Sequence, residues 1–289
     1  MHPVWPERAR FLKFVVVGLL LAGVAVGTAG CTDGPVPSAG VWEIGDVDTL
    51  AASTASRDSV LALLGRMQRT ALDSAFARLD AYGVTRRVRT EQLDTTGAVT
   101  AARTRILRYA PGAETGRLQR ADSTGTFQRG GVLSGISPQP TRRARPANLA
   151  TQALADQPAY LAPRTQEAYR YALRPGSLPG GTPVLVVEAK ARAHGRGAEQ
   201  GIRYARLTLD RASLQLVGLT VFRNSRILLF QEQSRVTLRL RPVSAGPSPP
   251  VWLPRRTRVR ARVDVPLRAS RQFRTVSVYS EYEAQNAPS

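Results

Sequence analysis

Histidine and cysteine, the side chains that most often bind zinc, are nearly absent from the chain. Two histidines and one cysteine occur among 289 residues. His2 lies at the start, and His194 lies in a predicted turn beside Gly195, where an exposed position is ordinary. A zinc site needs three or four such ligands, and the single cysteine, Cys31, forms no internal disulfide. The composition therefore predicts no metal site and no disulfide framework.

Motifs of enzyme chemistry are lacking as well. The chain has neither a Gly-x-Ser-x-Gly nucleophile motif nor a phosphate-binding P-loop. Glu281 and Glu283 share one strand face, as paired catalytic carboxylates can. The neighbouring arginines favour a solvated, salt-bridged edge instead. We predict no enzymatic activity and no cofactor.

Lysine is scarce, although the chain is strongly basic. Of 41 basic residues only Lys13 and Lys190 are lysine, and the formal net charge is +20. Such a charge ordinarily indicates nucleic acid, but the arginines are spread over predicted strands and the N-terminus predicts export. No nucleic acid is therefore expected. Anionic lipid head groups, lipopolysaccharide phosphates or cell-wall polymers are better candidates for a partner than nucleic acid, but a merely solvated face is the favoured interpretation.

An uncharged apolar run near the N-terminus has the layout of an export signal. The elements in order are Arg8, Arg10 and Lys13, the run 14–26, and Thr28-Ala29-Gly30-Cys31. This order is typical of a bacterial signal peptide. The last four residues resemble a lipobox, where a lipoprotein precursor is diacylated on cysteine and cut just before it, although Thr28 stands where leucine is usual. An uncleaved anchor is the alternative, but residues 14–30 are short for a span of roughly 20 residues.

The N-terminal prediction sets the expected location and organisation of the protein. Residues 1–30 are the signal peptide, Cys31 carries the acyl chains, such as palmitate, that hold the protein on a membrane, and residues 31–55 are a tether. Residues 56–289 form one domain. Thr32, where retained lipoproteins carry aspartate, favours the outer membrane, facing the periplasm. We expect a monomer that meets other envelope proteins.

The C-terminal third alternates apolar and polar residues. Val236, Leu238 and Leu240 lie on one phase, with Thr237 and Arg239 on the other. A period of two puts one set on a buried face and the other in water. The pattern predicts a meander of antiparallel strands with one apolar and one cationic face. The predicted strands are 84–93, 99–109, a short one at 126–132, 184–193, 202–210, 214–223, 227–241, 258–265 and 273–283, with a proline-rich loop at 242–254.

A helix and a proline-rich insert complete the predicted fold. Residues 58–82 keep an i, i+3/i+4 apolar spacing, with Ser56 or Asp58 as the cap. Seven prolines between residues 134 and 179 exclude regular strands there, leaving short helices at 147–156 and 165–171. We interpret the insert as a lid over the apolar face, held by Leu154, Tyr160 and Tyr169 among others. The fold class is mainly β (α+β): a curved antiparallel sheet or incomplete β-barrel, with an N-terminal helix and a lid.

The predicted ligand-binding residues come from one assumed turn. If Asn224 and Ser225 form a two-residue turn, Val221 faces Leu228, and one side of the sheet carries a continuous apolar set. That set lines the candidate cavity: Val217, Leu219, Val221, Leu228, Phe230 and Leu238.

The combination of elements resembles the LolA/LolB-like lipoprotein-localisation superfamily. The resemblance rests on the helix 58–82 and the hairpins after it, the insert 134–179, the segment 202–223 with Asp210 in its turn, and Trp252-Leu253-Pro254 before a strand. The resemblance implies an incompletely closed barrel whose apolar concave face receives acyl chains. It predicts an outer-membrane lipoprotein that binds a lipid or a lipoprotein acyl chain and takes part in the transport of lipids or lipoproteins. The alternative is a structural or interaction lipoprotein that docks an anionic partner through its arginine-rich face.

Overall fold

The computed structural model describes residues 50, 52–67, 81–113, 115–127, 160–161, 165–192, 201–227, 230–244, 251–264 and 270–284. The signal peptide, Cys31, Leu154, His194 and Leu228 lie outside these residues. So do most of the tether and most of the insert.

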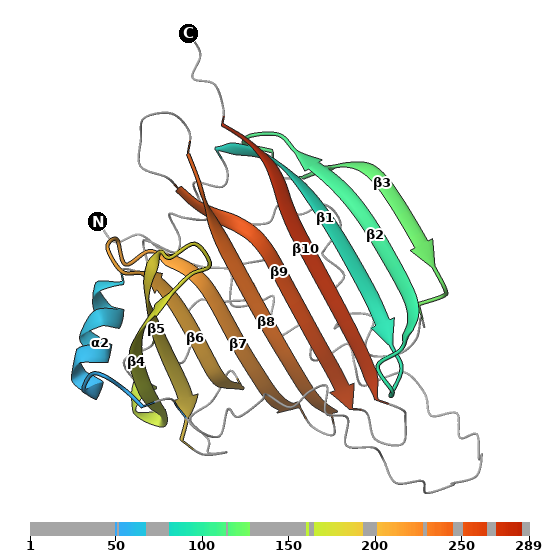
Figure 1. Cartoon of the computed structure of the whole chain (residues 1–289). Helices are drawn as coiled ribbons and strands as arrows, with labels where there is room; N and C mark the ends of the chain where they lie inside the picture. Colours follow the sequence, from blue (N-terminus) through green and yellow to red (C-terminus); the bar gives the residue numbers. More distant parts are fainter. Residues whose placement is uncertain are drawn as a thin grey trace, which may run out of the picture. The chain divides into compact units, whose positions relative to one another are not determined.

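Ten strands in the described residues form a single antiparallel sheet (Figure 1). They are β1 (Tyr82–Leu93), β2 (Val99–Tyr109), β3 (Arg117–Thr124), β4 (Tyr169–Ser177), β5 (Pro183–Ala191), β6 (Ile202–Asp210), β7 (Leu216–Ile227), β8 (Phe230–Val243), β9 (Val251–Asp264) and β10 (Arg271–Ala284). The order across the sheet is β3-β2-β1-β10-β9-β8-β7-β6-β5-β4. The last strand therefore pairs with the first. The edge strands β3 and β4 are not paired with each other, so the curved sheet stays open, as the predicted fold class requires.

The two faces of the sheet differ in the way that the alternation predicted. Leu219 pairs with Leu238, and Leu238 with Thr257, so these side chains share one face. We call it the helix face, because Leu207, Leu219 and Leu238 on it form one cluster with the helix. The opposite face carries Arg239 and Arg258 and is called the arginine face. The prediction of one apolar and one cationic face is confirmed.

One α-helix, α2 (Arg57–Arg66), packs against β4 at the sheet edge (Figure 1). The Ser56 side chain accepts a hydrogen bond from the Ser59 amide, which caps the first turn. Val60, Leu63 and Leu64 are buried. The predicted start and cap are confirmed, whereas residues 68–80 of the predicted helix lie outside the described residues. No described helix is long and apolar enough to span a bilayer.

Several predicted boundaries are wrong, chiefly near prolines. Residues 169–177 form strand β4, although Pro175 lies within it. An edge strand tolerates proline because one side of its backbone has no partner strand. Ahead of β4, the predicted short helix is the 3-10 turn η2 (Gln166–Ala168). The expected loop 242–254 is shorter, since β9 begins at Val251 and includes Pro254. A strand that was not predicted, β3, lies at residues 117–124, and most of the predicted strand 126–132 lies outside the described residues.

Candidate ligand-binding face

The half of the helix face formed by β4 to β8 is an apolar cluster. Leu207, Leu219 and Leu238 follow one another across β6, β7 and β8. They are 1%, 5% and 5% exposed. Val60 and Leu64 of α2 belong to the same cluster. This half of the face therefore has the packing of a protein core, with α2 as part of its cover.

Three tyrosines close the edge of this cluster. Tyr171 donates a hydrogen bond from its hydroxyl to the Tyr160 carbonyl at 2.8 Å, and Tyr169 donates one to the Ile202 carbonyl at 3.0 Å. The Tyr160 and Tyr169 rings meet edge-on, 6.4 Å apart. Burial raises the pKa of all three phenols. Tyr160 thus packs on the helix face as a lid anchor would, whereas Tyr169 belongs to the sheet itself.

The predicted cavity residues divide between the faces. Leu219, Val221 and Leu238 lie together in the apolar cluster. Val217 does not, because a bulge between Thr208 and Leu209 of β6 gives β7 an extra residue, and Val217 packs with Val184 and Val186 on the arginine face. Its assignment to the cavity side is wrong.

The register behind that prediction is also wrong. Asn224 and Ser225 are not a turn but lie within β7, which runs on to Ile227. Ile227 pairs with Phe230, so Val221 faces Val236 and Leu219 faces Leu238. Leu228 lies outside the described residues, and Phe230 is described by its backbone pairing alone.

The other half of the helix face, on β9, β10, β1 and β2, is more polar. From Leu238 the row continues through Thr257, Ser277 and Val88. Next to this row Val84, Leu107, Tyr109 and Tyr279 form a second small apolar cluster. The helix face thus changes from an aliphatic surface into one where hydroxyls and apolar groups alternate.

A charged side chain, Arg86, is buried in this second half. It is 4% exposed and lies opposite Tyr279 of β10 and Leu107 of β2. Its Nε and Nη2 both donate to the Ser277 hydroxyl oxygen, at 3.3 and 3.1 Å. The guanidinium carbon lies 5.6 Å from the centre of the Tyr279 ring. The sequence interpretation did not include Arg86, although it falls in phase with Val84 and Val88.

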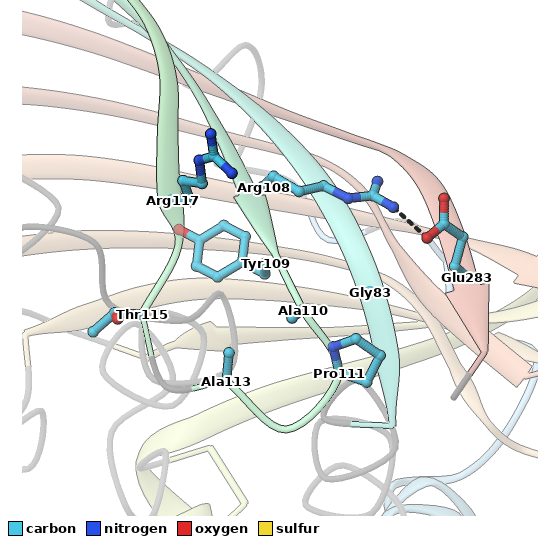
Figure 2. A pocket seen from close by; sticks show the side chains of 9 residues that line it. All are labelled: Gly83, Arg108, Tyr109, Ala110, Pro111, Ala113, Thr115, Arg117 and Glu283. Atoms are coloured by element: carbon cyan, nitrogen blue, oxygen red, sulfur yellow. Dashed lines mark ion pairs between the residues drawn. The ribbon is translucent and has the colours of Figure 1, made fainter. Parts of the chain in front are cut away.

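A pocket of about 300 Å³ lies at the sheet end where β1 begins and β2 ends (Figure 2). Arg108 crosses its rim to form an ion pair with Glu283, and Nη1 of Arg108 lies 3.3 Å from Glu281 Oε2. The Tyr109 ring lines the pocket, and a Cβ on Gly116 would lie only 2.8 Å from that ring. The two glutamates therefore form a salt-bridged edge, which is the interpretation that the sequence favoured.

Neither a protein-family model nor a curated protein matches the chain. Among solved structures, a DUF1329 family protein from Desulfovibrio piger is similar at 14% identity and TM-score 0.28, over 80% of this chain and 94% of that one. A LolA superfamily protein from Nitrosomonas europaea is similar at 12% identity and TM-score 0.26, over 81% and 96%. A domain described as an outer membrane lipoprotein-sorting protein, from Vibrio parahaemolyticus, is similar at 11% identity and TM-score 0.30, over 79% and 93%.

Two of these descriptions agree with the resemblance drawn from the sequence. They name the LolA superfamily and lipoprotein sorting. Because the TM-scores are 0.30 or below, we infer neither a ligand nor a function from these likenesses. Both are argued from the geometry of the sheet.

Proposed function

We propose that the protein binds a hydrophobic ligand, an acyl chain of a lipid or of a lipoprotein, on the helix face while its acylated Cys31 holds it on the outer membrane. One observation carries the proposal. The helix face continues over an open sheet of ten strands, whereas its described cover is one ten-residue helix with Tyr160 and Leu161. Removing apolar surface from water gains about 25 cal/mol per Å², which favours an acyl chain as part of the cover of this face.

The part of the helix face beyond the apolar cluster is the proposed site of the chain. Ala261 of β9 lies there, half-buried, between Ser234 and Phe273. A larger side chain at this position would occupy the space of a bound acyl chain without removing any group from the cluster. Thr237, also half-buried, lies on the arginine face of β8 and is the matched position.

Native mass spectrometry of the full-length protein tests the proposal. The wild type is expected to release a co-purified lipid or acylated species. Ala261→Phe should bind about tenfold less of it or lower still, because the phenyl ring would occupy the space of the acyl chain. Thr237→Phe should keep the wild-type amount. Equal lipid in all three proteins, or none in the wild type, would contradict the proposal.

The insert supplies a second test. We propose that residues 134–164 are the displaceable lid, since Tyr160 reaches the apolar cluster and residues from 169 onward belong to β4. Deleting residues 137–162 should leave the sheet intact by circular dichroism and raise ANS fluorescence. A folded deletion protein without that rise would exclude the lid.

The anchor is tested separately. Cys31→Ser should abolish incorporation of radiolabelled palmitate and release the protein from the outer-membrane fraction. Thr32→Ser keeps the predicted cleavage site and should label as the wild type does. Label in the Cys31→Ser protein would exclude the lipobox.

The arginine face favours a second candidate function, docking of an anionic envelope component. Six arginines of β8, β9 and β10 gather on it: Arg235, Arg239, Arg256, Arg258, Arg260 and Arg274. Among the described residues only Arg274 of these six has an ion pair, with Glu91. Partial burial and then the neighbouring guanidinium groups lower the pKa of Arg258. Mutual repulsion of this kind is relieved by a bound polyanion.

Vesicle binding distinguishes this candidate. The doubly substituted Arg256→Gln, Arg258→Gln protein should lose salt-sensitive binding to vesicles with anionic lipid and keep its co-purified ligand. Unchanged vesicle binding would leave the arginine face as a solvated surface.

A further inference from the structure

Arg86 is an exception to the usual burial of charge. Arginine is almost never fully buried unless an opposite charge accompanies it. Arg86 is 4% exposed, yet within the described residues it forms no ion pair. Its two hydrogen bonds share one neutral acceptor, the Ser277 hydroxyl.

One nitrogen of this guanidinium group has no hydrogen-bond partner among the described residues. Nη1 of Arg86 is buried and makes no hydrogen bond. A buried donor without an acceptor destabilises the folded protein, and more so when the donor is charged. Ser277 and the Tyr279 ring hold the other side of the group, so Nη1 is held in a fixed position with its N–H donors available to a ligand.

On the described strands β1 and β2, the side chains on this face add positive charge and no negative charge. Arg103 and Arg105 of β2 lie on the same face, opposite Thr90 and Val88 of β1. The alternate residues of β1 and β2 on this face, from Val84 to Gln92 and from Ala101 to Tyr109, include no aspartate or glutamate. The charges that β1 and β2 carry on this face therefore favour an anionic ligand.

The position of Arg86 relates it to the proposed acyl site. Leu219 of β7 and Arg86 of β1 lie on the same face, four strand spacings apart in the order β7-β8-β9-β10-β1. At ~4.8 Å per spacing this is about 19 Å along the sheet. Ala261, the proposed chain position on β9, lies between these two strands, so a ligand with its apolar chain over Ala261 can place its head group toward β1 and Arg86.

We propose that Arg86 binds the oxyanion head group, a carboxylate or a phosphate, of a single-chain acyl amphiphile. The inference rests on the proposed function and specifies its ligand class. Nη1 donates to one oxygen of the anion, and Ser277 and Tyr279 orient the guanidinium plane. Guanidinium suits this task because its donors lie in a rigid fork that matches carboxylate and phosphate oxygens.

A pair of probes that differ only in charge tests the proposal. cis-Parinaric acid and its methyl ester have the same fluorescent chain, but only the acid has an anionic head. Both are titrated into the full-length protein in one neutral detergent, so partition into micelles is common to all proteins compared. The wild type should bind the acid about tenfold or more tightly than the ester.

The variants separate a binding role from a structural one. Arg86→Met should bring the acid-to-ester ratio close to one, and Arg86→Lys should keep part of it. Arg87→Met, the same charge change at the exposed neighbouring position on the opposite face, should keep the wild-type ratio. Ser277→Ala, which removes the acceptor that orients Arg86, should lower the ratio.

The thermal stability of the unliganded proteins gives a second readout. Because the buried charge of Arg86 forms no ion pair with a described residue, Arg86→Met should melt at the wild-type temperature or above it, whereas a purely structural arginine would make this variant less stable. Two results would overturn the proposal. One is a wild-type acid-to-ester ratio in Arg86→Met. The other is a clear loss of stability in Arg86→Met together with an unchanged ratio in Arg86→Lys and Ser277→Ala.

The remaining outcomes distinguish the two levels of the argument. If the wild type binds the acid and the ester equally, the head-group inference fails and the proposed function stands. If it binds neither, the proposed function fails as well. Oleate in excess should displace the bound acid, and inorganic phosphate in excess should not. Equal displacement by both would indicate a site for free anions and would overturn the proposal that the ligand is an acyl amphiphile.

Discussion

The two faces of the sheet use the same strands for opposite purposes. On β6, Leu207 is 1% exposed in the apolar cluster, while the side chain of Arg206, one residue earlier, is 44% exposed on the arginine face. On β8, Leu238 and Arg239 repeat the contrast. Because successive side chains of a strand point to opposite faces, each strand contributes to folding on one face and to surface charge on the other.

The difference shows where a binding site is compatible with folding. A site in the aliphatic half of the helix face would compete with the core, since α2 and Tyr160 already cover it. The polar half contains small hydroxyls and one uncompensated arginine, which are poor core residues and good ligand contacts. The site that we propose therefore begins where the core ends.

The largest effect is expected from truncating the core. Leu207→Ala should lower the free energy of unfolding by about 2–5 kcal/mol, because the removed methyl groups leave a cavity among packed side chains. Arg206→Ala, its neighbour on the arginine face, should change it by less than about 1 kcal/mol. Urea denaturation of both variants measures the contrast. Similar losses in the two would show that stability is shared between the faces.

A smaller effect is expected at the rim of the core. Tyr171→Phe removes the hydrogen bond to the Tyr160 carbonyl and should cost about 1 kcal/mol. Since Tyr160 belongs to the proposed lid, the variant should also speed hydrogen exchange around residues 160–161 more than in β6. Exchange that is unchanged at 160–161 would separate Tyr160 from any lid motion.

The alternation in the sequence was sufficient to predict the two faces but not the register between strands. Val236, Leu238 and Leu240 fall on the helix face as their spacing required. Val217 does not, because one bulge reverses the phase of β7 at that point and leaves no mark in the local pattern. Asn224 and Ser225 have the composition of a turn, yet pairing with β8 keeps them extended.

The candidate site had a weaker signal than the core. Leu219, Val221 and Leu238 were placed on one face by their alternate spacing together with an assumed turn, and they share that face although the turn is wrong. Arg86 was visible as a charge in phase with Val84 and Val88, but an arginine-rich strand contains many charges, and only the pairing with Tyr279 and Leu107 shows that this one is buried. The Pro175 position illustrates the reverse error, because a proline in the sequence does not exclude an edge strand.

The smallest expected effect concerns pH and lies on the arginine face. Burial alone would raise the pKa of Glu91, but hydrogen bonds from Arg274 and Arg89 outweigh it and lower this pKa below the ordinary value of 4.5. A carboxyl group with a lowered folded-state pKa stabilises the fold above its unfolded pKa, and this contribution is lost as the pH falls through the folded value. Because both arginines are partly exposed, the contribution should be below about 1 kcal/mol.

Glu91→Gln should therefore reduce the loss of stability on acidification from near pH 5 downward. At neutral pH the variant should be slightly less stable than the wild type. Urea denaturation at a series of pH values measures both differences, and Arg274→Met should reproduce them in part by removing one partner. Parallel pH profiles for the wild type and Glu91→Gln would mean that this ion pair contributes nothing to folding, and the contrast between a stabilising helix face and a solvated arginine face would then be sharper still.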